Sequence, residues 1–374
     1  MQLNGFMVAF KDISWSVTLF IVIYHILLLV LLPIYLISTI PSFGLLISTV
    51  MLMIICGLSI TAGYHRFYSH RAYSLHKIPE AFLLFFGTMS AQTSALRWSA
   101  YHRVHHSHSD TEQDPYSVKH GFWHAHIFWL FRTKEPRYNV VKDLQKNKLV
   151  MFQHNHYVPL LIFTNLIAVL FFGWLFQDYF GAFVFIFLVR LFINNHTTWF
   201  VNSLAHTWGA KPYSREHTSV NNFIVAILTH GEGYHNYHHV FPSDYRNGVR
   251  WYQWDPTKIF IWMLHKVGLA KGLRKANLYA MRKRLVLEDK KQLLKKTFGK
   301  EELQRKIMVL AERLNEKLGE INKPIRDYKL MKQEKMRKEI MTALKFRIKN
   351  LKRSLRNDFR SWNHLCNEIL YQKA

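Results

Sequence analysis

Four long apolar stretches constrain the fold of this 374-residue chain more than any other feature. We expect them to occupy residues 13–40, 43–63, 159–176 and 182–205. A helix needs about 20 apolar residues to cross the hydrocarbon core of a bilayer. Buried core helices are the alternative interpretation, which the lengths of these stretches disfavour. The sequence therefore predicts an all-α membrane protein with four transmembrane helices.

The positions of Lys and Arg predict how these helices are oriented. The turn at Pro41 and Ser42 and the turn over residues 177–180 contain no basic residue. Nearly all basic residues lie on the other side, which the positive-inside rule places in the cytoplasm together with both termini. Arg190, inside the fourth stretch, is the exception, and we expect it to face protein or a polar cavity. The shorter stretch 78–95 predicts a helix at the membrane interface or re-entering it.

Charge divides the chain into two parts. The net charge is +26, and about 30 of the 50 basic residues and about 12 of the 24 acidic residues lie beyond residue 270. We therefore predict a membrane domain over residues 1–275, whose cytoplasmic helical cap is formed by residues 64–158 and 206–275. Residues 276–374 are predicted to form a basic helical extension.

The extension carries apolar residues at helical spacing. They are Leu303, Ile307, Leu310, Leu314 and Leu318. This pattern favours a charged helical hairpin or coiled coil. A basic surface that contacts anionic lipid, or that docks an acidic electron donor, is the second interpretation. No motif supports nucleic-acid binding, and we expect the protein to bind no nucleic acid.

Histidines are concentrated beside the predicted transmembrane helices. The candidates are His65, His70, His102, His105, His106, His206, His235, His238 and His239. Positions i, i+3 and i+4 share one face of a helix, so each H-x-x-H-H group directs three imidazoles at one point. His65 and His70 fall on different faces of a regular helix, and the pair therefore favours a helix end or a distorted turn.

Nine imidazoles are too many for a single zinc ion, which takes about four ligands. Imidazole also suits copper, iron and nickel, and we expect two ions of a redox metal, iron by preference. Glu232 and His235 have the spacing of ferritin-like di-iron carboxylate sites, but no comparable second pair follows. We treat Glu232 as incidental or as a partner of a ligand. Acidic residues past the second cluster are candidates to hold imidazole N–H groups, with a solvated acidic turn as the alternative. They are Asp110, Glu112 and Asp114.

The histidine boxes HRFYSH, HRVHH and HNYHH resemble those of membrane-bound acyl desaturases of the stearoyl-CoA desaturase type. The stretches NSLAH, TEQDPY and DYRNGVRWYQWDPTK support the resemblance, which covers residues 10–275. It implies a four-span fold with a cytoplasmic cap and a di-iron centre ligated by the nine histidines above. It also implies that Asn202 reaches one metal through a water. Gln92, Trp98 and Thr198 match positions that shape the bend of a buried acyl tunnel.

The resemblance implies an O₂-dependent enzyme that inserts a cis double bond, usually at C9–C10, into a long saturated acyl chain. Two positions differ from animal members of the family. Ala100 stands where an arginine helps to hold the CoA phosphates, and Thr93 stands where an asparagine follows the tunnel glutamine. The acyl carrier therefore stays open between CoA, acyl carrier protein and a membrane glycerolipid.

No His-Pro-Gly-Gly haem signature is present. We therefore expect a separate electron donor, such as ferredoxin, rubredoxin or cytochrome b5 with its reductase. A bacterial inner membrane is favoured over the endoplasmic reticulum. Two other functions remain as alternatives. A histidine-box fatty acid or alkane hydroxylase would form an alcohol, and a non-enzymatic membrane scaffold would need no metal.

Overall fold

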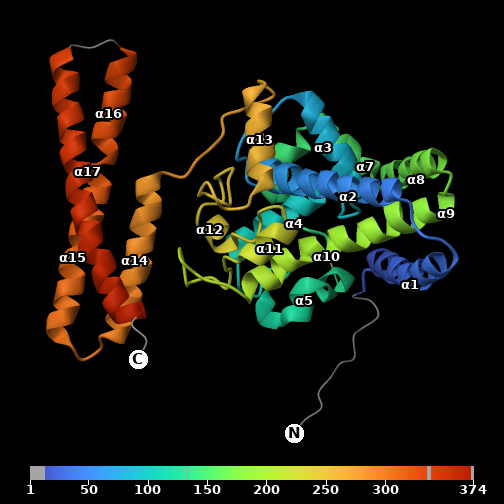
Figure 1. Ribbon diagram of the computed structural model, residues 1–374, viewed down its shortest axis with the longest axis horizontal. Helices are drawn as coiled ribbons and strands as arrows, with labels where there is room; N and C mark the ends of the chain where they lie inside the picture. Colours follow the sequence, from blue (N-terminus) through green and yellow to red (C-terminus); the bar gives the residue numbers. More distant parts are fainter. Residues whose placement is uncertain (1–12, 133, 335–337, 372–374) are drawn as a thin grey trace, which may run out of the picture. The chain divides into compact units, whose positions relative to one another are not determined.

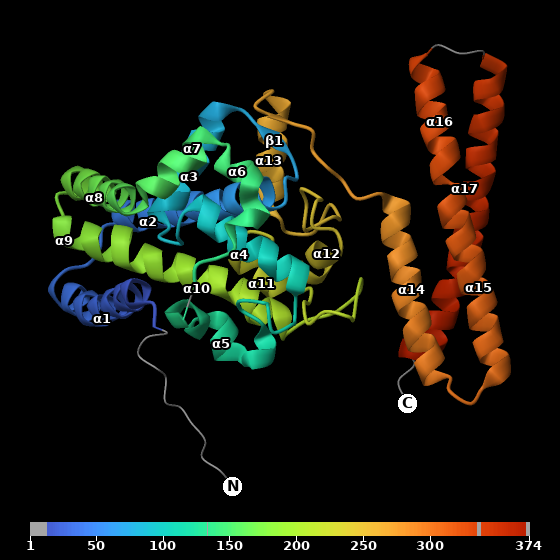
Figure 2. The ribbon, with the colours of Figure 1, turned by 180° about the vertical axis from the view of Figure 1, so that it is seen from behind.

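The computed structural model describes residues 13–132, 134–334 and 338–371, and these form two compact units (Figures 1 and 2). Unit 1 comprises Met1–Ala210 and His217–Lys275, and unit 2 comprises Lys211–Glu216 and Ala276–Ala374. The segment Lys211–Glu216, which the sequence assigns to the cap, thus contacts mainly unit 2. Residues 1–12, predicted to be cytoplasmic, lie outside the described residues.

Four helices of unit 1 are long and apolar enough to cross a membrane, which confirms the prediction of a four-span, all-α membrane protein. They cover Trp15–Ser38, Phe43–Ser69, Tyr157–Phe176 and Tyr179–His206. The second helix extends six residues beyond the predicted 43–63. This extension carries His65 on the same continuous helix as the apolar stretch.

Two of the four spans contain π-helical segments. The second comprises α2 (Phe43–Leu58) followed by η2 (Ser59–Ser69). In the fourth, η6 (Ala182–Val189) precedes α10 (Arg190–Asn202). A π-helix bonds each N–H to the carbonyl five residues earlier. The His70 N–H donates such a bond to the His65 carbonyl at 3.1 Å. The widened turn brings the two histidines of the H-x₄-H pair together, as a regular helix would not.

The predicted interfacial stretch 78–95 is divided between two helices. Helix α3 (Lys77–Met89) exposes Ile78, Phe82 and Phe85 while burying Leu83 and Leu84. This amphipathic pattern suits a helix at a membrane surface. The chain then turns, and α4 starts at Ala95 and ends at His108. The turn between them includes Gln92 and Thr93.

Short elements complete the cap of unit 1. A small antiparallel sheet pairs β1 (Ser74–Leu75) with β2 (Ala270–Lys271). The remaining α-helices of this unit are α1 (Trp15–Ser38), α5 (Phe122–His126), α6 (Lys142–Gln145), α7 (Lys148–Asn155), α8 (Tyr157–Phe176), α9 (Tyr179–Gly181), α11 (Phe223–Leu228), α12 (His235–Val240) and α13 (Pro256–Lys266).

Arg190 faces protein, as predicted. Its Nε donates to the Ile186 carbonyl at 2.6 Å, and its Nη1 donates to the Met89 carbonyl at 3.1 Å. The side-chain oxygen of Asn165 accepts a further hydrogen bond from Nη2. These acceptors satisfy a guanidinium that is fully buried within an apolar span.

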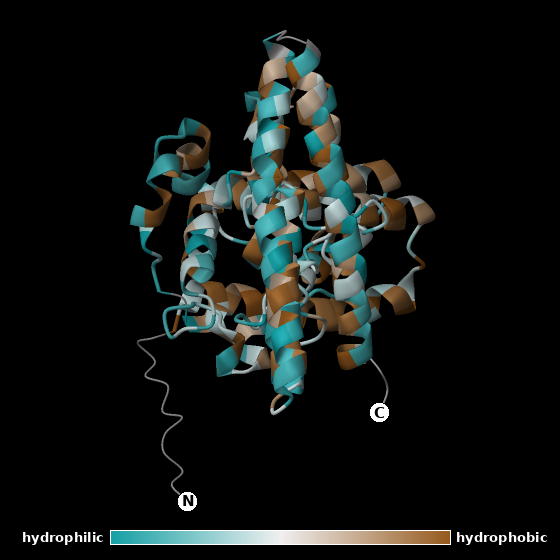
Figure 3. Ribbon diagram, turned by 90° about the vertical axis from the view of Figure 1, so that its left-hand side faces the viewer, coloured by the Kyte–Doolittle hydropathy of each residue, from teal (hydrophilic) through white to brown (hydrophobic). Residues whose placement is uncertain are grey.

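Unit 2 is a helical bundle with its own apolar core. Its helices are α14 (Leu278–Lys296), α15 (Glu301–Glu320), α16 (Asn322–Gln333) and α17 (Lys338–Cys366), followed by η8 (Asn367–Tyr371). Ile307, Leu314 and Leu318 are buried in the core, and Leu303 and Leu310 pack against it. The predicted apolar stripe is therefore confirmed. Polar and apolar segments alternate along these helices (Figure 3).

Candidate metal centre

The nine candidate histidines gather in unit 1 from four parts of the chain. The π-helical end of the second span supplies His65 and His70, and the 3₁₀ turn after α10 supplies His206. Helices α4 and α12 supply three each. Two groups result, each with its ligand atoms within 4.8 Å of one another. Group 1 contains His65, His70, His102, His106 and His238, and group 2 contains His105, His206, His235 and His239.

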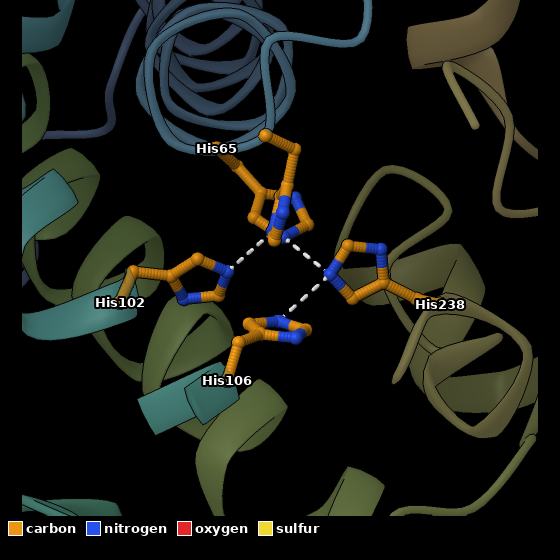
Figure 4. Close-up of side chains that lie close together, drawn as sticks. His65, His102, His106 and His238 are labelled. Atoms are coloured by element: carbon orange, nitrogen blue, oxygen red, sulfur yellow. Dashed lines mark hydrogen bonds between the residues drawn. The ribbon is translucent and has the colours of Figure 1, made fainter. Parts of the chain in front are cut away.

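In group 1 the imidazole nitrogens converge on one point (Figure 4). The Nε2 atom of His238 lies 3.0 Å from Nε2 of His65 and 3.0 Å from Nε2 of His106. Nε2 of His70 lies 2.8 Å from Nε2 of His102. Five imidazoles from three elements thus surround a space of atomic size.

Group 2 repeats the arrangement with four rings. Nε2 of His239 lies 3.3 Å from Nε2 of His105 and 3.0 Å from Nε2 of His235. The ring of His206 packs at a centroid distance of 4.9 Å from His235 and 5.2 Å from His239. Helices α4 and α12 contribute to both groups, and the two groups therefore share one scaffold.

Acidic side chains hold the other ring nitrogens. The Nδ1 atom of His105 lies 2.8 Å from Asp114, and Nδ1 of His65 lies 2.8 Å from Glu232. Glu232 is therefore a partner of a candidate ligand and not an incidental residue. Of the three acidic candidates after the second box, Glu112 differs: its side chain is 92% exposed and contacts only His120 among the described residues.

Asp110 acts on the site through a threonine. Its carboxylate accepts from the Thr218 hydroxyl at 2.6 Å and from the Thr218 N–H at 2.7 Å. Because that hydroxyl proton is committed to Asp110, the Thr218 oxygen accepts from Nδ1 of His206, 2.7 Å away. The outer contact fixes which nitrogen of His206 carries the proton.

This arrangement of ring nitrogens suits a cation between the rings. Nδ1 of His105 hydrogen-bonds to Asp114, and Nδ1 of His65 lies 2.8 Å from Glu232, so in a neutral ring that carries its proton on Nδ1 the Nε2 atom keeps a lone pair that can bind a metal. The Nε2 of His65 lies 3.0 Å from that of His238, and the Nε2 of His105 lies 3.3 Å from that of His239. A metal ion between the rings would accept lone pairs held at these distances, as would an Nε2–H on the facing ring. The residues therefore fit a pair of imidazole-ligated metal ions.

Burial keeps these imidazoles neutral. Desolvation, reinforced by the neighbouring imidazoles, holds the pKa of several of them well below its ordinary value. They are His70, His102, His106, His235, His238 and His239. Burial alone would raise the pKa of Glu232, but the Arg66 guanidinium and His65 lower it to about 2. The neutral imidazole is the form that metal binding requires.

A cavity of about 510 Å³ reaches group 1. His65 and His102 line it, as do the three residues predicted to shape a tunnel, Gln92, Trp98 and Thr198. The Gln92 side-chain amide donates to the Thr198 hydroxyl at 2.9 Å. Asn202, the last residue of α10, also lines the cavity, four positions before His206. This volume lies within the usual range for small-molecule sites.

The sequence pattern described as "Fatty acid desaturase" matches residues 40–259, more than half of the chain and the region that contains all nine histidines. The chain belongs to the fatty acid desaturase family.

Relatives in this family carry names that specify different acyl carriers. "Probable acyl-CoA desaturase" of Schizosaccharomyces pombe is 48% identical over 58% of this chain and 46% of its own length. "Acyl-CoA desaturase 1" of Saccharomyces cerevisiae is 41% identical over 64% of this chain and 48% of its own length. "sn-1 stearoyl-lipid 9-desaturase" of Anabaena variabilis is 34% identical over 71% of this chain and 96% of its own length. The chain thus spans about half the length of the first two relatives.

Sequence reasoning missed several residues that shape this desaturase-family site. Arg66 is fully buried, donates to Glu232 at 2.8 Å and pairs with Asp255 at 3.1 Å. The hydroxyl of Tyr116 lies 3.2 Å from Nδ1 of His102. Arg66 lies inside the first histidine box, and this position was the only feature of the sequence that indicated a role at the site. No sequence feature indicated a role for Thr218, because that role depends on its contact with Asp110.

Proposed function

We propose that this protein is an O₂-dependent fatty acyl desaturase that inserts a cis double bond at C9–C10 of a long saturated acyl chain. One observation carries the proposal: a cavity large enough for a small-molecule ligand is lined by His65 and His102, two of the five converging imidazoles of group 1. Membership of the fatty acid desaturase family and the names of its relatives support the same reaction.

The nine histidines would hold two iron ions, and Asn202 would contact one of them through a water. Iron bound there would supply the oxidising chemistry that removes hydrogen from unactivated methylenes, which no side chain provides. Asp114, Glu232 and the Asp110–Thr218 pair hold the ring orientations. The mostly apolar lining of the cavity would limit the access of bulk water to this chemistry.

The cavity would select the position of the double bond. The hydrogen bond between Gln92 and Thr198 joins the α3–α4 turn to α10 across the cavity wall, beside Trp98. A wall fixed at this point orients the acyl chain so that one pair of methylenes faces group 1. The distance from this pair to the closed end of the cavity then determines the accepted chain length.

The stoichiometry calls for an electron donor. Formation of one double bond removes two hydrogens from the substrate, and full reduction of O₂ to two waters takes two further electrons and two protons. We propose that a separate protein, such as ferredoxin, rubredoxin or cytochrome b5 with its reductase, supplies these electrons. The cap and both termini would face the cytoplasm, in a bacterial inner membrane or the endoplasmic reticulum.

The acyl carrier stays open between a thioester and a glycerolipid, because relatives are named for both. Ala100 is fully buried, and no cationic side chain stands at that position to hold CoA phosphates. Supplying purified protein with stearoyl-CoA or stearoyl-phosphatidylcholine, with O₂ and a reductant, distinguishes the two carriers.

Fatty-acid profiling of cells that express the chain tests the proposal, with His238→Ala as the control. A new monounsaturated acid in the wild-type cells alone supports a desaturase, and its double-bond position tests C9–C10. A hydroxylated acid would establish the hydroxylase alternative. Identical profiles in both cultures would refute the proposed activity.

A further inference from the structure

Helix α17 of unit 2 (red in Figure 1) carries a continuous basic stripe. The stripe consists of the exposed residues Lys345, Lys349, Lys352, Arg353, Arg356 and Arg360. At 3.6 residues per turn they fall within one arc of the helix, and the stripe is about 22 Å long. No acidic residue lies in that arc. Asp358, on the opposite side, pairs with Lys317 at 2.6 Å.

The charges of the stripe are uncompensated within the described part of the chain. None of its six cations forms an ion pair with a residue that the structure describes, whereas basic residues on α14 do: Arg284 and Lys291 both contact Glu216, at 3.0 and 2.8 Å. Residues 276–374 as a whole carry 27 Lys and Arg against 12 Asp and Glu. The stripe therefore presents its positive potential to an outside partner.

The other face of α17 argues against insertion into a bilayer. Leu355 and Trp362 are buried in the core of unit 2, and Ile348 is buried on the same side of the helix. A helix that binds a membrane by insertion needs a free apolar face, and α17 has already buried its own against α14 and α15. The exposed surface offers cations and one aromatic side chain at their edge, Phe346, which is 64% exposed. Aromatic residues beside charged ones are typical of protein interfaces.

We propose that this stripe docks an acidic electron-carrier protein. The inference rests on the proposed function, which consumes two electrons for each double bond. A carrier with an acidic surface complements the stripe, and charge complementarity of this kind accelerates encounter and fixes orientation. The six residues of the stripe lie outside residues 40–259, the region that the family pattern matches.

A combined variant tests the docking: Lys345→Glu, Lys349→Glu, Lys352→Glu and Arg356→Glu. The matched control reverses the same number of charges at exposed positions of α15 and α16: Arg305→Glu, Lys306→Glu, Lys323→Glu and Lys329→Glu. The probes are the soluble haem domain of cytochrome b5 and a ferredoxin, titrated onto the full chain in neutral phosphatidylcholine nanodiscs. At low salt the stripe variant should bind a carrier at least about tenfold more weakly than the control variant. About 0.5 M salt should largely remove the difference.

An equal loss of carrier affinity in the stripe variant and the control variant would overturn the proposal, because the loss would then reflect net charge alone. It is also overturned if the stripe variant keeps its carrier affinity but loses flotation with phosphatidylserine vesicles, which would make the stripe a lipid surface. The titration measures binding and needs no turnover. Absence of a double bond under dithionite would refute the proposed function, while the titration would still decide on the stripe.

Discussion

The Nδ1 atom of His65 lies 2.8 Å from the Glu232 carboxylate, which also accepts from Nε and Nη2 of Arg66 at 3.1 and 2.8 Å. One buried carboxylate thus connects a candidate metal ligand to a buried cation. Asp255 contacts the same guanidinium, and its carboxylate accepts from the Asn247 and Gly248 N–H groups. These ion pairs and hydrogen bonds therefore connect the candidate metal centre to the loop before α13.

Glu232→Gln should weaken both metal binding and the fold. The neutral amide removes a negative charge that compensates the Arg66 guanidinium. Breaking a buried ion pair costs about 3–5 kcal/mol. Loss of a carboxylate behind a ligating histidine typically lowers metal affinity about 10- to 100-fold. Thermal unfolding and iron titration measure the two effects. Glu112→Gln, at an exposed carboxylate, is the control and should change neither.

The same carboxylate predicts a dependence of stability on pH. The pKa of Glu232 is lowered from 4.5 to about 2 in the folded protein. Its stabilising contribution is therefore present above pH 4.5 and is lost as the pH falls toward 2. Unfolding midpoints measured between pH 5 and pH 3 should fall less steeply in Glu232→Gln than in the wild type. Parallel curves would contradict this assignment.

Gly57→Ala should shorten the acyl chain that the cavity accepts. Gly57 lines the cavity, and a Cβ atom there would lie 2.4 Å from the His230 ring, which must then move. One methylene of space is worth about 1–3 kcal/mol in selectivity, so the ratio of 16- to 18-carbon product should rise about tenfold. Gas chromatography of the products measures it.

Gly44→Ala is the matched control. Gly44 lies on α2, as Gly57 does, but its Cβ would meet Phe176 of α8, and neither Gly44 nor Phe176 lines the cavity. An equal change in the product ratio for both variants would show that helix packing, and not the cavity, controls chain length.

Thr198→Val should reduce turnover without removing metal. The hydroxyl of Thr198 accepts a hydrogen bond from the Gln92 amide at 2.9 Å, and valine of similar shape leaves that half-buried amide without its acceptor. An unsatisfied buried group costs about 1–3 kcal/mol, and we expect about a tenfold loss of activity. The control is Thr197→Val, whose hydroxyl donates to carbonyls of its own helix. Loss of iron in Thr198→Val would contradict a role in the cavity alone.

Much of this architecture follows from short-range sequence patterns. The apolar stretches predict four spans, and the H-x-x-H-H spacing predicts three rings on each of α4 and α12. The prediction that each set of three is directed at one point was wrong, because both helices divide their rings between groups 1 and 2. The π-helix over Ser59–Ser69 was not predicted as such, because its apolar content and helix propensity do not distinguish five-residue from four-residue hydrogen bonds. The sequence indicated only a distortion near His65 and His70.

Contacts between distant positions could not be predicted. Glu232 reaches His65 across 167 positions of sequence, and Gly57 faces His230 across a similar separation. No local pattern encodes either pairing. Asp110 was placed near the site by its position after the second box, but its action through Thr218 depends on how the 217–222 segment folds against α4.

Metal analysis of the purified full-length protein tests the central claim most directly. Two groups of five and four imidazoles, each with converging ring nitrogens, predict two iron ions per chain by elemental analysis. One zinc ion per chain, or no bound metal after loading with ferrous iron, would contradict the account.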